Sequence, residues 1–109
     1  MQSTLSCARK NNVVINSESQ QFQISGLPAN TWVGSRNFEL MQSTECKGAK
    51  LYEIRSIVDI DQCKTSCLEY NCNAVNLFQI AEMDFMCEIL GEVDSYEPAQ
   101  GAACYVVNT

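Results

Sequence analysis

The sequence predicts a small disulfide-stapled α+β domain with one α-helix at about residues 60–70 and antiparallel strands around it. Three observations lead to this prediction. The 109 residues include seven cysteines, six of them between Cys46 and Cys104, which is the density of a disulfide scaffold. One stretch has apolar residues at the period of a helix. Several other stretches have the alternating or short apolar patterns of strands.

The predicted helix lies within residues 59–72, DIDQCKTSCLEYNC. Asp59 is a favourable N-cap, and the side chain of Gln62 can reach back to the N–H of Asp59 in a capping box. Asn71 tolerates the left-handed conformation in which helices end, so we expect the helix to stop near Tyr70. One apolar stripe runs along the helix at positions Ile60, Cys63, Cys67 and Tyr70.

The two cysteines inside the helix are not expected to bond to each other. Cys63 and Cys67 are four residues apart, which separates their Cβ atoms by about 5–6 Å in a helix. A disulfide requires about 3.5–4.5 Å. Cys72 follows Cys67 closely enough to fold back onto it, which leaves Cys63 to bond to a more distant segment.

Two strand candidates follow the helix, at residues 73–80 (NAVNLFQI) and 84–90 (DFMCEIL). The connection between them, residues 81–83, is short enough for an antiparallel hairpin. In the second strand, Phe85, Cys87 and Ile89 point to one face. If Cys87 reaches Cys63, that face lies against the helix.

The rest of the scaffold is predicted to be strand and loop. Gly91 begins a polar loop that runs through Pro98, and residues 103–107 (ACYVV) form a last strand. This strand carries Cys104. Cys46 is the remaining scaffold cysteine that could pair with it. A further strand and a connection to the helix are predicted from the apolar positions Leu51, Ile54, Ile57 and Val58.

Residues 1–45 are expected to form a β-like extension, either two or three short strands or an arm packed on the main domain, which spans residues 46–109. Trp32 is expected to be a core or lid residue rather than an exposed contact, because large aromatic side chains usually bury most of their area. Cys7 is the odd cysteine. It is either a free or interchain thiol, which could make a homodimer, or a cysteine of a disordered terminus.

The cysteines also indicate the compartment. A disulfide scaffold is typical of a secreted protein or of the extracellular portion of a membrane protein. The rival interpretation, a zinc site, requires close C-x2-C pairs or histidines, and the chain has neither. No apolar run is long enough to insert into a membrane, and the N-terminus lacks the layout of a signal peptide, so we expect an excised segment.

We expect no catalysis, no metal and no cofactor. The chain has no histidine to act as a base for a serine or cysteine nucleophile. Glu53 could pair with Glu88 or Asp94, but exposed acids are usually a solvated face. The net charge of −6 argues against nucleic acid as a partner.

A stretch without lysine or arginine near the end of the chain is strongly acidic. This stretch either serves solubility alone or is a docking site for a basic patch on a partner. Its acidic residues are Glu82, Asp84, Glu88, Glu92, Asp94 and Glu97.

Residues 46–107 resemble the PAN/apple module. The resemblance lies in Cys46, the C-x3-C-x4-C pattern of the helix, an alanine two residues after it, the Cys87-Glu88-Ile89-Leu90 segment and a closing cysteine. It implies an antiparallel sheet that cradles one helix, and binding of a protein or carbohydrate partner through the sheet and loops. The nested disulfides that it implies are Cys46–Cys104, Cys63–Cys87 and Cys67–Cys72, although Cys7 could compete for Cys104.

Three roles fit these observations. The first is a non-catalytic extracellular recognition module for a protein or a glycan. The second is a structural or oligomerising module linked through Cys7. The third is a secreted antagonist of a host or haemostatic protein. The fold class does not choose among them.

We predict that reduction of the disulfides unfolds the protein. By loop entropy, the outer, middle and inner disulfides implied by the resemblance would each stabilise the fold by about 4, 3.5 and 2 kcal/mol when considered singly. Each is comparable with a large part of the stability of a small domain. Thermal unfolding with and without reductant measures the effect, and an unchanged midpoint would contradict the prediction.

Overall fold

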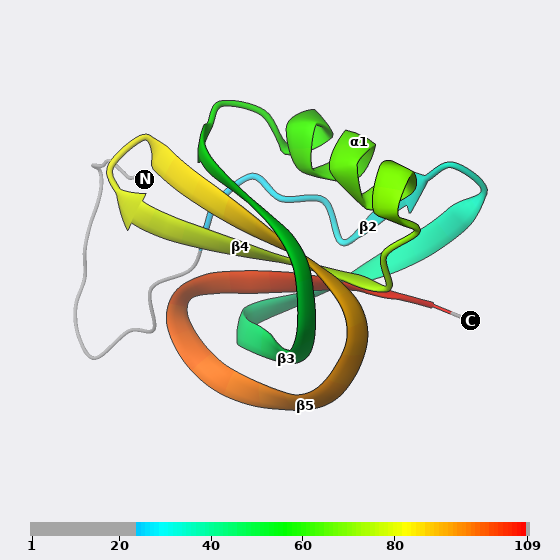
Figure 1. Ribbon diagram of the computed structural model, residues 1–109. Coiled ribbons are helices and arrows are strands. Elements are labelled where there is room, and N and C mark those ends of the chain that lie inside the picture. Colours follow the sequence, from blue (N-terminus) through cyan, green and yellow to red (C-terminus); the bar gives the residue numbers. More distant parts are fainter. Residues whose placement is uncertain (1–23, 109) are drawn as a thin grey trace.

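The computed structural model describes residues 24–108 of the 109-residue chain. It is a small α+β domain in which one helix lies on a curled antiparallel sheet (Figure 1). Its elements are, in order, β2 (Asn30–Val33), β3 (Arg36–Ile57), α1 (Ile60–Tyr70), β4 (Ala74–Ala81) and β5 (Asp84–Val107).

The sheet is built around β4. The strand order is β2-β3-β5-β4, and β4 pairs with both halves of β5, so that Val75 lies opposite Ile89 and also opposite Tyr105. β3 pairs with β5 from one end to the other, because β5 doubles back along the opposite side of β4. The two long strands therefore curl together around the shorter one (Figure 1).

The middle parts of β3 and β5 form a two-stranded curled ribbon, residues 44–48 paired with residues 93–98. The register shifts between Gln42 and Thr44 and on both sides of Gly48. Such bulges bend a strand and increase its twist. Figure 1 shows the resulting loop of β3 and β5 on the side of the sheet away from α1.

The structure confirms both predicted ends of the helix. The side chain of Asp59 accepts a hydrogen bond of 2.9 Å from the N–H of Asp61, and Gln62 completes the capping box. At the other end Asn71 has φ 54° and ψ 50°, the left-handed C-cap conformation. The apolar stripe is narrower than expected, because Tyr70 is exposed.

Two apolar clusters lie on opposite faces of the sheet. Consecutive residues of a strand point to opposite faces, and β4 sends Val75 to one cluster and Ala74 to the other. The larger cluster packs under α1. The smaller one lies against the curled ribbon and consists of Cys46, Ala74, Leu90 and Cys104, with Val93 and Val106 beside them.

Three disulfides join these layers, in the pairs named above. Cys46–Cys104 ties the ribbon to β5, with a Cα–Cα distance of 6.0 Å. Cys63–Cys87 ties α1 to the opposite face of β5, with a Cα–Cα distance of 6.3 Å. Cys67–Cys72 closes the chain just after the helix. The sheet is therefore bonded covalently on both of its faces.

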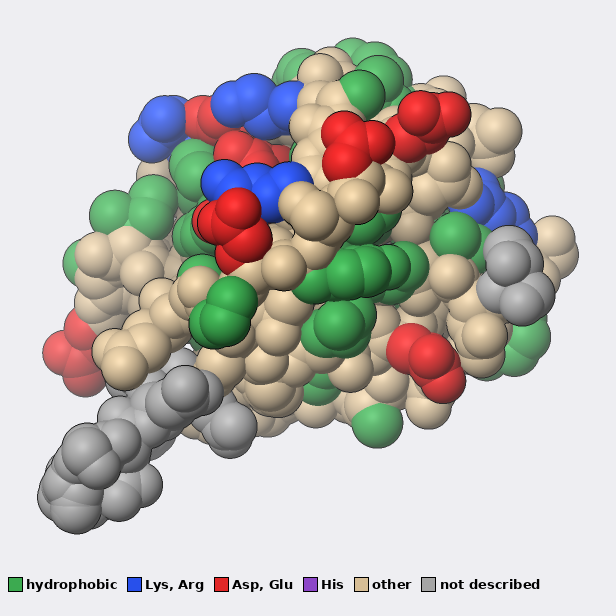
Figure 2. Space-filling model, turned by 90° about the horizontal axis from the view of Figure 1, so that it is seen from below, with side chains coloured by type: hydrophobic (Ala, Val, Ile, Leu, Met, Phe, Trp, Pro, Cys, Tyr) green, Lys and Arg blue, Asp and Glu red, His purple; other side chains and the backbone are tan. Residues whose placement is uncertain are grey.

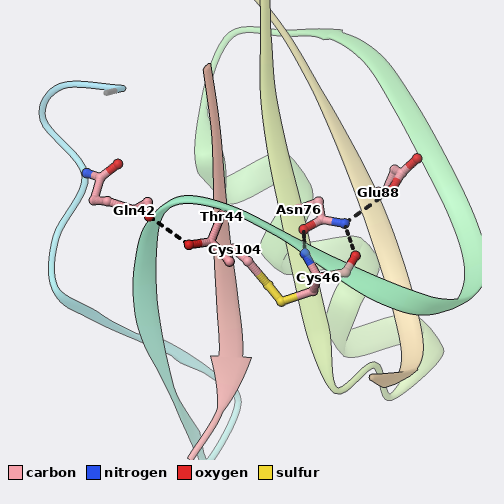
Figure 3. The surroundings of a disulfide bond; sticks show 6 residues. All are labelled: Gln42, Thr44, Cys46, Asn76, Glu88 and Cys104. Carbon is pink, nitrogen blue, oxygen red and sulfur yellow. Dashed lines mark hydrogen bonds between the residues drawn. A yellow bond between two sulfur atoms is a disulfide. The ribbon is translucent and has the colours of Figure 1, made fainter. Parts of the chain in front are cut away.

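Asn76 of β4 supports the disulfide under the ribbon (Figure 3). This asparagine is fully buried. Its Oδ1 accepts a hydrogen bond of 2.8 Å from the N–H of Cys46, and its Nδ2 donates to the carbonyl oxygen of Cys46, also at 2.8 Å. Nδ2 also donates to Glu88 at 3.2 Å. The side chain thus pairs with Cys46 as a neighbouring strand would.

The prediction of a polar loop from Gly91 through Pro98 is wrong. These residues belong to β5 and pair with β3, with Glu97 opposite Glu45. The separate last strand predicted at residues 103–107 is the end of the same β5. Glycine and proline are local turn signals, whereas pairing with a distant strand decides the conformation here.

The structure describes only part of the predicted N-terminal extension, residues 24–45. β2 and the first part of β3 lie within residues 1–45, and the boundary placed between residues 45 and 46 falls inside β3. Residues 1–23 of the predicted extension, including Cys7, lie outside the described residues. Their strand predictions and the alternatives for Cys7 stay predictions.

We predict that Gly48→Ala destabilises the protein by about 1–3 kcal/mol, the range of overpacking. A Cβ at Gly48 would lie 1.7 Å from the carbonyl oxygen of Glu92, which is backbone and cannot rotate away. Gly91→Ala is the matched control, because its Cβ would meet only the side chain of Leu51, at 3.5 Å. Urea unfolding of both variants measures the difference, and equal stabilities would contradict the role of Gly48.

Candidate functional site

Two of the acidic residues singled out above, Glu53 and Glu88, form ion pairs with basic side chains. Glu53 lies opposite Glu88 in the sheet, and Lys50 contacts both, with its Nζ 2.8 Å from Glu53 and 3.6 Å from Glu88. Arg55 contacts Glu53 as well, at 2.8 Å. The lysine and the arginine thus balance the charges of the two carboxylates.

The pKa values of these groups reflect that pairing. The hydrogen bond and charge of Glu53 raise the pKa of Lys50, and the hydrogen bond from Lys50 lowers the pKa of Glu53. A hydrogen bond to Glu45 likewise raises the pKa of Lys47. Because such exposed pairs contribute little to stability, their main effect is to break up the acidic surface.

The acidic stretch runs from the β4–β5 hairpin along β5 into the curled ribbon. Glu82 and Asp84 lie at the β4–β5 hairpin, Glu88 lies in the sheet, and Glu92, Asp94 and Glu97 lie in or beside the ribbon. The Nζ of Lys47 lies 4.0 Å from Glu97, and the Nζ of Lys50 lies 3.6 Å from Glu88. Figure 2 shows acidic side chains beside basic ones on one face of the molecule. Pairing with β3 places basic side chains next to β5, which has no lysine or arginine of its own.

A different surface stands out, next to α1. Trp32 of β2 is 60% exposed and Leu68 of α1 is 59% exposed. Together with Val33, Gly34 and polar side chains of the helix they line a shallow hollow of about 300 Å³, which we name the Trp32 hollow. Trp32 was expected in the core, and that prediction is wrong.

The local sequence explains why Trp32 faces outward. Along β2 the side chains of Thr31 and Val33 are buried and Trp32 lies between them, so it points to the opposite side. The strand is followed at once by the turn at Gly34, where φ is 62°. This turn packs on α1, since a Cβ at Gly34 would lie 3.0 Å from Leu68. The alternation of side chains along β2 indicated that Trp32 faces outward, although the size of tryptophan favoured burial.

The helical wall of the hollow is one face of α1. Asp61, Lys64, Thr65 and Leu68 occur at the spacing i, i+3, i+4 and i+7, which places them in one row. Lys64 lies 3.8 Å from Asp61. The hollow therefore combines two apolar side chains, Trp32 and Leu68, with a carboxylate, an ammonium group and a hydroxyl.

Arg36 holds the helix beside the β2–β3 turn. Its guanidinium donates to the side-chain oxygens of Asn71 at 3.0 Å and of Asn73 at 2.7 Å, and it lies over the ring of Phe38. The C-terminal end of α1 is thereby attached to the start of β3. Arg36 thus holds the β2–β3 turn, which follows Trp32, beside the C-terminal end of the helix.

The segment that leads into β2 is anchored to the core by Tyr105. The hydroxyl of Tyr105 donates a hydrogen bond of 2.6 Å to the carbonyl oxygen of Pro28. Burial raises the pKa of Tyr105 to about 12. Gln42 also donates to the carbonyl oxygen of Ile24, at 3.2 Å. These bonds span many residues of sequence, and no local pattern indicates them.

Within residues 24–108, no three histidine, cysteine, aspartate or glutamate side chains are grouped so that they could hold a metal ion. No helix in this part of the chain has the length and hydrophobicity to cross a membrane.

The sequence matches no protein-family model, and no curated protein or solved structure was found to be similar to it. The structure itself defines the class. It is a small disulfide-rich domain with a curled antiparallel sheet and one helix. Three disulfides in a domain of this size are typical of secreted and extracellular proteins.

We predict that Tyr105 of the wild-type protein ionises well above the ordinary pKa of a tyrosine and that Tyr105→Phe removes this late step. The folded-state pKa of about 12 exceeds the ordinary tyrosine value of 10.0, because burial disfavours the phenolate. The contribution of this group to stability is complete below the unfolded-state pKa and is lost as pH rises through the folded-state value. Ultraviolet titration of tyrosinate measures it, with Tyr96→Phe as the exposed control. A late step that persists in Tyr105→Phe would contradict the prediction.

Proposed function

We propose that this protein is a non-catalytic recognition module of the extracellular space and that it binds a glycan through the Trp32 hollow. The observation that carries the proposal is the 60% exposure of the only tryptophan, in a hollow with a second exposed apolar side chain. Large apolar side chains exposed side by side mark interaction sites more often than chance exposure does.

The chemistry of the hollow fits a sugar ring. A pyranose has a face of C–H groups and a rim of hydroxyls, so it needs a flat apolar platform with donors and acceptors beside it. Trp32 supplies the platform. Asp61 accepts hydrogen bonds, Lys64 donates them, and Thr65 does both. A hollow of about 300 Å³ is at the small end of ligand sites, which suits one or two sugar rings.

Two further observations support an extracellular recognition role. The three disulfides hold the sheet and helix rigid, as an oxidising compartment allows. Residues 46–107 resemble the PAN/apple module, for which binding of proteins or carbohydrates is the implied activity. We propose that the domain is a member of this class with its hollow built partly from β2, which precedes the matching segment.

We predict that Trp32→Ala weakens glycan binding at least tenfold, a loss of about 1.4 kcal/mol, because the platform disappears. Leu68→Ala should weaken it less, since Leu68 only borders the platform. The matched control is Tyr96→Ala, which removes an aromatic side chain that is 50% exposed on the ribbon. The oxidised wild-type protein is first screened on a glycan array, and the best glycan is then titrated calorimetrically into each variant.

Because Trp32 is mostly exposed, its removal should leave the circular dichroism spectrum unchanged. Equal affinities of wild type and Trp32→Ala would remove the hollow as the site. If no glycan binds, and a pull-down from extracellular proteins captures a partner that Trp32→Ala loses, the occupant is a protein surface for which Trp32 is the hot spot.

A further inference from the structure

A second hollow lies where α1 begins, beside Asp59 and Ile60. Its volume is about 270 Å³ and it shares no residue with the Trp32 hollow. Here the connection from β3 to α1 meets the segment before β2 and the β4–β5 hairpin (Figure 1). Its walls are mainly apolar and are formed by Ile24, Leu27, Ile57 and Ile60, with Leu77 and Phe85 from the sheet.

The size and lining of this apolar pocket suit a small apolar molecule. A cavity of about 150 Å³ lined by leucine, isoleucine and phenylalanine is enough to bind benzene. The pocket is larger and has the same kinds of side chain. Ile24, Ile57 and Leu77 are themselves buried, so these parts of the wall are already packed in place. Such preformed apolar sites are typical of ligand pockets.

The sheet side of the pocket is rigid. Phe85 and Cys87 are two residues apart on β5 and point to the same face. Cys87 is bonded to Cys63 of α1. The helix and the strand that border the pocket are therefore held at a fixed separation, and the pocket cannot close by a shift of the helix toward β5.

The charge at the pocket selects among apolar ligands. Asp59 is the one charged residue among those that line it, and no lysine or arginine does so. Its Oδ1 accepts a hydrogen bond from Asp61, and a carboxylate has capacity for further donors. A helix N-terminus alone would favour an anion. Here the carboxylate of Asp59 already occupies that position, so it favours a cation.

We propose that the apolar pocket binds a small arylalkyl amine, with the aromatic ring against Leu77 and Phe85 and the ammonium group on Asp59. The ring supplies the apolar body that the walls exclude from water. The ammonium group supplies the opposite charge and donates hydrogen bonds to the carboxylate. The site is independent of the glycan site, so failure of either proposal leaves the other unaffected.

The test compares three ligands that share one ring, 2-phenylethylamine, 2-phenylethanol and phenylacetate. Each is titrated into the isotope-labelled, oxidised protein while its amide spectrum is recorded by NMR. We expect 2-phenylethylamine to shift the amides of Ile57, Leu77 and Phe85 saturably, with a Kd of about 1 mM for so small a ligand. The alcohol should bind about tenfold more weakly and phenylacetate more weakly still.

Asp59→Asn isolates the charge, because asparagine caps a helix as well as aspartate does. In this variant the amine and the alcohol should bind within about twofold of each other. Glu69→Gln is the matched control. It removes one exposed acid from the same helix, away from the pocket, and should leave the preference for the amine intact.

Three results would overturn the proposal. The first is the absence of saturable shifts at the pocket residues. The second is binding of phenylacetate as tight as that of the amine. The third is an equal loss of preference in Asp59→Asn and Glu69→Gln, which would show that net charge alone attracts the amine.

Discussion

The pairing of Asn76 with the backbone of Cys46 is the constraint on which the curled ribbon depends. The ribbon lies over a face of the sheet that carries only a small apolar cluster, so hydrophobic burial on that side is limited. The sulfur of Cys46 is bonded to Cys104. The Asn76 side chain forms hydrogen bonds with the N–H and the carbonyl oxygen of Cys46. Unpaired, these two buried groups would each cost about 1–3 kcal/mol. The ribbon can therefore stay closed with little apolar area beneath it.

The opposite face is organised by α1, and both proposed sites border it. A helix of 11 residues is marginal in isolation, so its position comes from its attachments. Cys63 is bonded to the sheet, Cys67 to the chain after the helix, and Arg36 contacts the C-terminal end. The Trp32 hollow uses the exposed face of the helix, and the apolar pocket uses its N-terminal end.

The sequence was informative wherever the deciding interactions are local. The capping box at Asp59 and the left-handed cap at Asn71 involve residues a few positions apart, so both ends of the helix could be predicted. The stretch from Gly91 could not, because its strand conformation depends on pairing with β3, some 45 residues earlier in the register. The acidic stretch had the same difficulty, since Lys47 and Lys50 come from the neighbouring strand. Trp32 is a different case. Its size favoured burial, whereas the alternation along β2, with Thr31 and Val33 on the buried side, leaves Trp32 on the outer face.

The disulfides of α1 make the Trp32 hollow and the apolar pocket depend on an oxidising compartment. Each surface is made of residues from at least two elements, with the helix as the shared one. If Cys63 and Cys67 were thiols, the helix would lose its covalent attachments, and a short helix with a narrow buried stripe has few contacts to replace them. Trp32 and Leu68 would then no longer be held at one distance, and Asp59 would no longer face the pocket. Disulfide formation therefore supports the two proposed binding surfaces as well as stability, because Cys63 and Cys67 attach the helix that both surfaces share.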